Sequence, residues 1–140
     1  MPASTPPPDA IWRVALPVPL PRLFDYRPAA GSAMAADVGC RVRAPFGSRE
    51  LVGLIAAVGS AETDVVELKT AERLDAAPLF HGELLDSLRW LARYTHAPLG
   101  EVFATALPAP LRQGDPLAET HSWAWRLNEA GRTALARLRG

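Results

Sequence analysis

Proline is the residue that most constrains how this chain can fold. The 140 residues contain 14 prolines and 10 glycines, and the proline content is about twice that of an average protein. Proline fixes φ and lacks a backbone donor, so it interrupts helix interiors and central strands. The sequence therefore disfavours a helical bundle and predicts a loop-rich, partly β architecture.

Short segments between the prolines have the alternation of β-strands. In residues 38–44, Val38, Cys40 and Val42 alternate with Arg41 and Arg43, which predicts a half-buried strand with both arginines on the polar face. Residues 28–37 are rich in Ala, Gly and Ser and predict a loop. The predicted strands cover residues 11–18, 23–27, 38–44, 51–58 and 65–70.

The period changes to that of a helix after residue 82. Apolar residues that include Leu88 and Leu91 recur at helical spacing over 82–94 and predict one buried stripe. Pro98 suits the first turn of a second, shorter helix. The Pro-rich stretch 107–111 predicts a domain boundary, followed by a strand at 122–127 and a helix capped by Asn128.

Net charge does not identify a partner. Fifteen basic and fifteen acidic side chains cancel, and fourteen of the basic residues are arginines, with Lys69 the single lysine. Residues 13–49 carry a balance of +4 and residues 61–101 a balance of −4. Such a partition is common for solvated faces and is also compatible with nucleic-acid binding.

Several classes of function are excluded by what these residues lack. A single cysteine, Cys40, rules out an internal disulfide and an all-cysteine metal site. Neither a phosphate-binding loop nor a nucleophile elbow occurs, and His81, His96 and His121 are scattered. The longest stretch free of charge, 51–61, is too short for the ~18 residues of a membrane helix. The missing catalytic motifs predict a non-catalytic protein. The absence of a membrane helix and of a signal-peptide pattern at the N-terminus predicts a cytoplasmic protein with no membrane partner.

An aromatic–acidic–aromatic triplet is the clearest candidate binding element. Phe24 and Tyr26 flank Asp25 on a short predicted strand, near the arginines Arg41 and Arg43. Aromatic rings beside arginines suit single-stranded nucleic acid, because bases stack and phosphates meet cations. A carboxylate repels phosphate but accepts a hydrogen bond from a hydroxyl. Phe24 and Tyr26 share one strand face, so they could equally be core residues.

Several motifs in a constant order give this chain a family resemblance. The sequence resembles the N-terminal region of the bacterial replication-restart helicase family, PriA or primosomal protein N′, over residues 13–112. The resemblance rests on segments 14–26, 39–47 and 51–53, then on Leu68-Lys69, Trp90–Tyr94, Ala97–Val102 and Ala106–Pro108.

The resemblance implies an α+β fold and three parts of the chain. It implies a small, mainly-β, barrel-like 3′-DNA-binding domain with a C-terminal helical pair at 11–110, after a disordered leader at 1–10. It also implies the incomplete start of a winged-helix domain at 111–140. For the full-length family it implies an ATP-dependent 3′→5′ helicase that uses ATP, magnesium and zinc. This segment is then expected to need no cofactor.

The resemblance also implies a site and its partners. Carried over by position, the pocket for the terminal nucleotide comprises Phe24, Asp25, Tyr26, Gly47 and Lys69. The expected ligand is single-stranded or forked DNA with a free 3′ end, bound without base preference. Primosome proteins and single-stranded-DNA-binding protein are the partners that the resemblance implies.

This chain departs from the family pattern in ways that bear on the site. The leader and the 28–37 loop are longer than the pattern. Ser48-Arg49-Glu50 carries one charge of each sign where the family often has further basic residues. Arg41, Arg43 and Arg49 are candidate contacts to the DNA backbone. One alternative function is an intramolecular or protein–protein docking module, in which the proline-rich strands, Arg41 and Arg43 contact another domain of the same helicase and DNA contact is incidental. The other is a stand-alone enzyme.

Overall fold

The strands form the first half of the molecule. The structure is a computed structural model that describes residues 9–61, 67–118 and 122–140. Proline or glycine lies in the connections β1–β2, β2–β3 and β3–β4, in line with the composition. The strands are β1 (Ala10–Ala15), β2 (Phe24–Pro28), β3 (Arg41–Phe46), β4 (Arg49–Ser60) and β5 (Thr70–Arg73).

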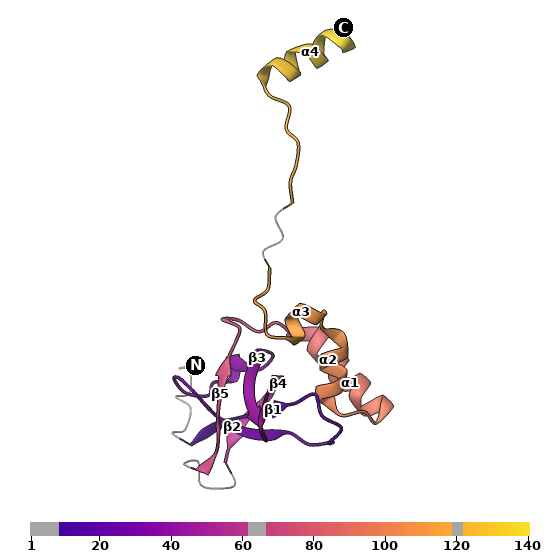
Figure 1. The fold of residues 1–140 in the computed structure, drawn as a ribbon. Helices are drawn as coiled ribbons and strands as arrows, with labels where there is room; N and C mark the ends of the chain where they lie inside the picture. The colour runs from indigo at the N-terminus through magenta and orange to yellow at the C-terminus, as the bar shows by residue number, and fades with distance from the viewer. Residues whose placement is uncertain (1–8, 62–66, 119–121) are drawn as a thin grey trace, which may run out of the picture.

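The five strands pair in the order β1-β2-β5-β3-β4 and close into a barrel, because β4 returns to β1 (Figure 1). The long strand β4 pairs antiparallel with both β3 and β1. Its register with β1 shifts between Arg13 and Val14, and such an irregularity bends a strand. Strands β2 and β5 are parallel and pair only at Arg27↔Thr70 and Pro28↔Ala71.

Two apolar clusters hold the domain together. The first fills the barrel, where Trp12, Val14, Tyr26, Val42 and Ile55 are all at most 5 % exposed. The second lies between the outer face of β4, at Leu54, and the helices that follow the barrel. Because Leu54 and Ile55 alternate, β4 contributes to both clusters.

Helices α1 (Gly82–Thr95), α2 (Leu99–Ala106) and α3 (Ala109–Arg112) pack together on one side of the barrel (Figure 1). Leu88 and Phe103 contribute their buried faces, and the Phe103 ring meets Phe80 edge to face at 5.1 Å. A side chain at Gly100 would collide with the backbone of Leu16. Glycine is therefore required where α2 approaches the loop after β1.

The C-terminal part of the chain stands apart from this body. The described residues between Asp115 and Asn128 form no helix or strand, and α4 (Glu129–Arg139) buries no residue (Figure 1). The predicted cap is confirmed, since the Asn128 side chain accepts a hydrogen bond from the Gly131 amide at 2.8 Å. The strand predicted at 122–127 is not formed, and Trp123 and Trp125 are fully exposed. The winged-helix start at 111–140 remains a prediction.

The α+β class and both main helices are confirmed, with differences at the boundaries. The predicted 65–70 strand is instead β5 at Thr70–Arg73, and residues 65–66 lie outside the described residues, as does most of the predicted 1–10 leader. The prediction that Leu91 belongs to the buried stripe is wrong, because it is 40 % exposed while Leu88 is 7 % exposed. None of the helices in the described ranges is long and apolar enough to cross a membrane.

Candidate nucleic-acid interface

The predicted site lies at one end of the barrel, where β5 no longer fills the space between β2 and β3. Strand β5 begins at Thr70, so its pairing with β2 covers Arg27 and Pro28 but stops short of residues 24–26. Side chains rather than a backbone ladder bridge this interval. We call it the β2–β3 seam, formed by residues 24–26 of β2, residues 45–47 at the end of β3, and Lys69.

Phe24 lies at the start of β2 and bridges the seam with its ring. The ring meets Phe46 edge to face, with 5.2 Å between the ring centroids. The Phe24 ring also contacts Arg22, whose guanidinium lies 4.7 Å from the ring centroid, a cation–π distance. Phe24 is only partly buried, so an aromatic surface beside a cation is available at the edge of the barrel.

Tyr26 bridges the seam through its hydroxyl and otherwise belongs to the core. The hydroxyl donates to the Pro45 carbonyl at 2.7 Å, and the residue is 5 % exposed. Burial disfavours the charged phenolate and raises the pKa of Tyr26 above its ordinary value of 10.0. For Tyr26, the interpretation as a core residue is therefore the one that its burial supports.

Asp25 points to the other face of β2. Phe24 and Tyr26 pack against the barrel interior, so the alternation of a strand places Asp25 on the outer face. It stands opposite Arg13 of β1 in the register, yet within the described residues no ion pair or side-chain hydrogen bond involves it. Asp25 is half-buried, and its carboxylate can accept hydrogen bonds.

Gly47 forms the tip of the β3–β4 hairpin. Phe46 pairs with Arg49, so Gly47 and Ser48 are a two-residue turn, and Gly47 has φ +60°. A positive φ at the first turn residue is the glycine position of a type II′ turn. A Cβ built at Gly47 would meet nothing within 4 Å. The glycine is thus required by backbone conformation, and the space above it is open.

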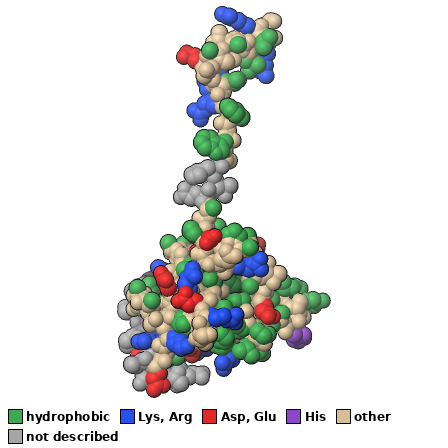
Figure 2. Space-filling model, in the orientation of Figure 1, with side chains coloured by type: hydrophobic (Ala, Val, Ile, Leu, Met, Phe, Trp, Pro, Cys, Tyr) green, Lys and Arg blue, Asp and Glu red, His purple; other side chains and the backbone are tan. Residues whose placement is uncertain are grey.

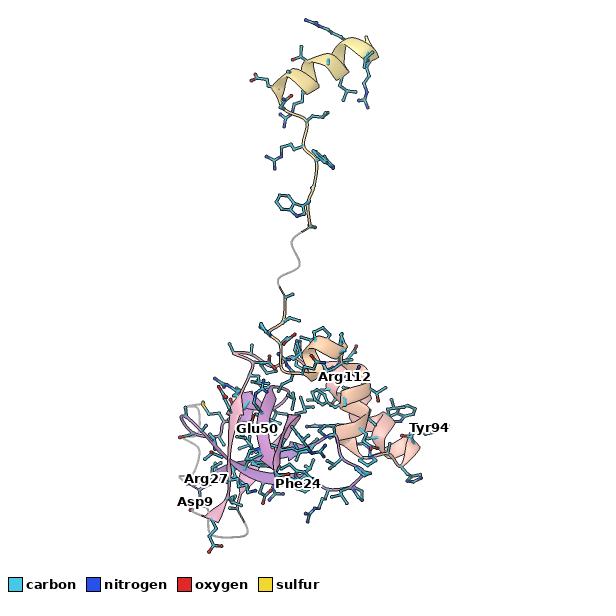
Figure 3. The ribbon with its side chains drawn as sticks, viewed as in Figure 1. Asp9, Phe24, Arg27, Glu50, Tyr94 and Arg112 are labelled. Carbon is cyan, nitrogen blue, oxygen red and sulfur yellow. The ribbon has the colours of Figure 1, made fainter. Side chains whose placement is uncertain are left out.

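Lys69 lies beside β2 just before β5 begins. The Lys69 carbonyl accepts a hydrogen bond from the Arg27 amide at 3.0 Å, and Lys69 is exposed. The β3–β5 register pairs Val42 with Arg73 and Arg43 with Glu72. Continuing this register by three residues brings Lys69 level with Phe46. The register and the side-chain contacts therefore bring Phe24, Tyr26, Gly47 and Lys69 to one end of the barrel, with Asp25 on the adjoining outer face. Phe24 and Arg27 of β2 are labelled in Figure 3.

The prediction that Arg41 lies on the exposed polar face of β3 is wrong, and its candidate contact to the DNA backbone loses that basis. Arg41 is fully buried, and its guanidinium pairs with the Asp75 carboxylate at 2.7 Å. Its Nη1 donates to the carbonyls of Leu111 and Asp115, at 2.8 Å each. Arg41 therefore joins β3 to the segments after β5 and α3. The predicted alternation did not reveal this, because these segments cover the outer face of β3.

The other two candidate arginines remain accessible to different degrees. Arg43 is half-buried, and its guanidinium packs closely against Gly114. Arg49 is exposed on the Gly47 hairpin. Acidic and basic side chains are interspersed on the visible face of the barrel (Figure 2), so the cations on this face are individual side chains within a mixed surface.

The long 28–37 loop is anchored next to the barrel. It contains the 3₁₀ helix η1 (Ala35–Asp37), whose Asp37 is 3 % exposed. The Asp37 carboxylate accepts hydrogen bonds from the Trp12 indole at 2.9 Å and from Arg73 at 2.6 Å. Both donors come from the barrel, so this contact fixes one end of the loop.

The cysteine and the two histidines in the described residues lie outside the seam. Cys40 is buried, as predicted, and burial raises the pKa of its thiol above 9.0. His81 and His96 occupy the two ends of α1, as predicted, and His121 lies outside the described residues. Among the described side chains, no group of three or more His, Cys, Asp or Glu is placed to hold a metal ion.

Two surface features were missed in the sequence analysis. Arg22 was not singled out, although it precedes Phe24 by two residues, the spacing that places side chains on one side of an extended chain. On α1, Trp90 and Tyr94 stack with 4.9 Å between their centroids and are 55 % and 71 % exposed. Their i, i+4 spacing predicts the contact, but not that the pair faces away from the barrel.

Comparison with known proteins finds relatives along most of the chain. Residues 13–108 match the family described as "3′DNA-binding domain (3′BD)". A protein named Replication restart protein PriA from Haemophilus influenzae is 41 % identical over 128 residues, covering 89 % of this chain. Its Treponema pallidum namesake is 34 % identical over 104 residues, covering 69 % of this chain. The chain spans only 17 % and 16 % of the lengths of these two relatives.

Proposed function

This chain belongs to the PriA family of replication restart proteins, and on that premise we propose that it binds DNA by recognising a free 3′ end. The ligand would be single-stranded or forked DNA whose terminal nucleotide lies at the β2–β3 seam. The observation that carries the proposal is the seam itself. There an aromatic ring, a carboxylate that makes no ion pair with any described residue, and an exposed lysine adjoin an interrupted strand pairing.

Each seam residue has a chemical role in this proposal. The half-exposed Asp25 would accept a hydrogen bond from the 3′ hydroxyl, which every nucleotide carries, so recognition would be independent of the base. Phe24 offers a partly exposed ring for the sugar or base. Lys69 would face the phosphate as a point charge. The open space above Gly47 would let the nucleotide approach the backbone closely.

The backbone of β2 supports the same placement. The Arg27 amide points toward β5, where it bonds to the Lys69 carbonyl. Backbone groups two residues apart on a strand point the same way, so the Asp25 amide is directed toward the seam. Since the β5 ladder stops at Arg27, no described strand pairs with this edge of β2 beside Asp25. A terminal nucleotide could therefore meet both the side chain and the backbone of one residue.

Comparing two dinucleotides, one ending in a 3′ hydroxyl and one in a 3′ phosphate, tests the proposal. The phosphate removes the donor and adds negative charge, and two charges about 4 Å apart repel by about 1–4 kcal/mol at high effective dielectric. We expect the phosphate-ended strand to bind at least about fivefold more weakly, as measured by fluorescence anisotropy. Asp25→Asn removes the charge but keeps an acceptor, so it should restore part of the lost affinity. Equal binding of both strands by the wild-type chain would refute 3′-end recognition.

Lys69 gives an independent measurement of the same site. Lys69→Ala should weaken binding equally for all four 3′-terminal bases, because a phosphate contact carries no sequence information. It should also reduce the slope of log K against log salt by about 0.7, the value for one phosphate contact to a single strand. A loss that depends on the terminal base would contradict the phosphate assignment.

The wider function follows from the family and stays a proposal for this chain. We propose that DNA binding here serves replication restart in the bacterial cytoplasm. ATP-dependent 3′→5′ unwinding, with magnesium and zinc, would belong to the parts of the relatives outside this chain's span. Primosome proteins and single-stranded-DNA-binding protein are the proposed protein partners. The alternative docking role is favoured by the exposed Trp90–Tyr94 pair, whereas the buried Arg41 takes no part in it.

A further inference from the structure

A groove with an apolar floor and arginine rims begins next to the seam. Its first part, with a volume of about 280 Å³, lies between the loop segment 21–23 and the junction of α1 and α2. A second hollow of about 390 Å³ shares Leu23, Ala92, Arg93 and Leu99 with it and continues onto β4. We call these two hollows together the arginine groove.

The charged residues that line the arginine groove are all positive. Arg22 and Arg93 line the first hollow, and Arg89 and Arg93 line the second. Arg89 is fixed in place, because its Nη2 donates to the Ala56 carbonyl at 2.6 Å. Arg22 and Arg93 are exposed. Arg89 and Arg93 are one helical turn apart on α1, about 6 Å along the axis at 1.5 Å per residue.

The groove is continuous with the seam through Arg22. Residues 21–23 line the first hollow and lead directly into Phe24, and the Arg22 guanidinium lies 4.7 Å from the Phe24 ring centroid. Figure 1 shows the loop between β1 and β2 reaching from the barrel toward α2, so the groove runs from the barrel to the helices. A strand that ends at Phe24 would thus have cations along its continuation.

We infer that the arginine groove binds the phosphates of the nucleotides that precede the 3′ terminus. This inference rests on the proposed function and extends it from one nucleotide to a strand. Arginine guanidiniums pair with phosphate by charge-assisted hydrogen bonds, and the apolar floor formed by Leu23, Ala92 and Leu99 suits sugars and bases. The single sign of the lining charge and the continuity with Phe24 favour DNA over an acidic peptide.

The test compares oligonucleotides of two lengths on the complete 140-residue chain. A dinucleotide reaches only the seam, whereas a hexanucleotide with the same 3′ hydroxyl end also reaches the groove. The double variant Arg22→Ala/Arg93→Ala removes the two exposed cations and leaves the Arg89–Ala56 contact intact. Arg112→Ala, an exposed arginine on α3 outside both hollows, is the matched control.

We expect the wild-type chain to bind the hexanucleotide more tightly than the dinucleotide, and the double variant to lose this gain. The salt slope for the hexanucleotide should fall by about 1.4, which is 0.7 for each phosphate contact removed. In the single variant Arg93→Ala, which removes a groove cation and leaves the Arg22–Phe24 contact intact, dinucleotide binding and its preference for a 3′ hydroxyl should not change. Arg93→Lys should retain most of the gain, because it keeps the charge, and the control should behave as wild type.

Two results would overturn the inference. One is a double variant that keeps the length dependence and the salt slope of the wild type. The other is a hexapeptide of glutamate and leucine that binds the wild-type chain but not the double variant, while the hexanucleotide binds both equally. The groove would then serve a protein partner. A failure of 3′-end recognition appears separately, as equal binding of the two dinucleotide ends.

Discussion

Replacing Arg41 by alanine separates a structural role from a DNA-binding role most sharply. The guanidinium makes two short contacts to the Asp75 carboxylate, at 3.0 Å from Nε and 2.7 Å from Nη2. It makes two more to the carbonyls of Leu111 and Asp115. Arg41→Ala would remove all four and leave the Asp75 carboxylate, whose side chain is only 10 % exposed, without its counter-charge.

The expected cost follows from this burial. Removing one partner of a buried ion pair typically costs about 3–5 kcal/mol, because the other charge stays desolvated and unpaired. A domain of this size is typically stable by about 5–15 kcal/mol, so the loss is a large share of the total. At about 4 °C or more per kcal/mol, the melting temperature should fall by at least about 12 °C.

Urea unfolding, followed by far-UV circular dichroism, measures the effect. The double variant Arg41→Ala/Asp75→Ala should be less destabilised than the sum of its two single variants, because it leaves no buried charge alone. The control Arg49→Ala, at an exposed hairpin position, should unfold within about 0.5 kcal/mol of wild type. If Arg41→Ala unfolds like the wild type yet loses affinity for DNA, the structural assignment is refuted and Arg41 is a DNA ligand.

Two further predictions concern the core. Leu88→Ala should destabilise the chain by about 2–5 kcal/mol. Leu91→Ala, at an exposed position, should change stability by about 0.5 kcal/mol or less. Equal losses of stability in urea unfolding would contradict this orientation of α1. Burial raises the folded-state pKa of Tyr26 above 10.0, so its contribution to stability is complete below about pH 10 and is lost as pH rises through the folded pKa. Tyr26→Phe should lower the free energy of unfolding by about 1 kcal/mol at pH 7, because it loses the hydrogen bond to Pro45. It should also make stability fall less steeply at alkaline pH. If stability falls as steeply as in the wild type, groups other than Tyr26 cause the decline.

The local pattern of the sequence was sufficient to predict strand β3, helix α1 and the helix cap at Asn128, because each depends on residues that are close together in the chain. The period of two in β3 and the period of 3.6 in α1 report which secondary structure can bury apolar side chains, so both elements were predicted close to their observed positions. The Asn128 cap was likewise predictable, because capping is completed within one turn of helix. The five candidate site residues came from the family resemblance, and their roles remain predictions.

Tertiary structure decided what depends on distant partners. Strand alternation predicted Arg41 on the polar side of β3, but Asp75 and the segment around Leu111 cover that side, and their partnership spans 34 and 70 residues. Leu91 fits the helical stripe, yet it is exposed because the barrel and α2 cover only part of that stripe. The seam itself arises because β5 begins at Thr70 and meets β2 for only two residues. Strand pairing between segments more than 40 residues apart depends on closure of the whole barrel, and no local period encodes it.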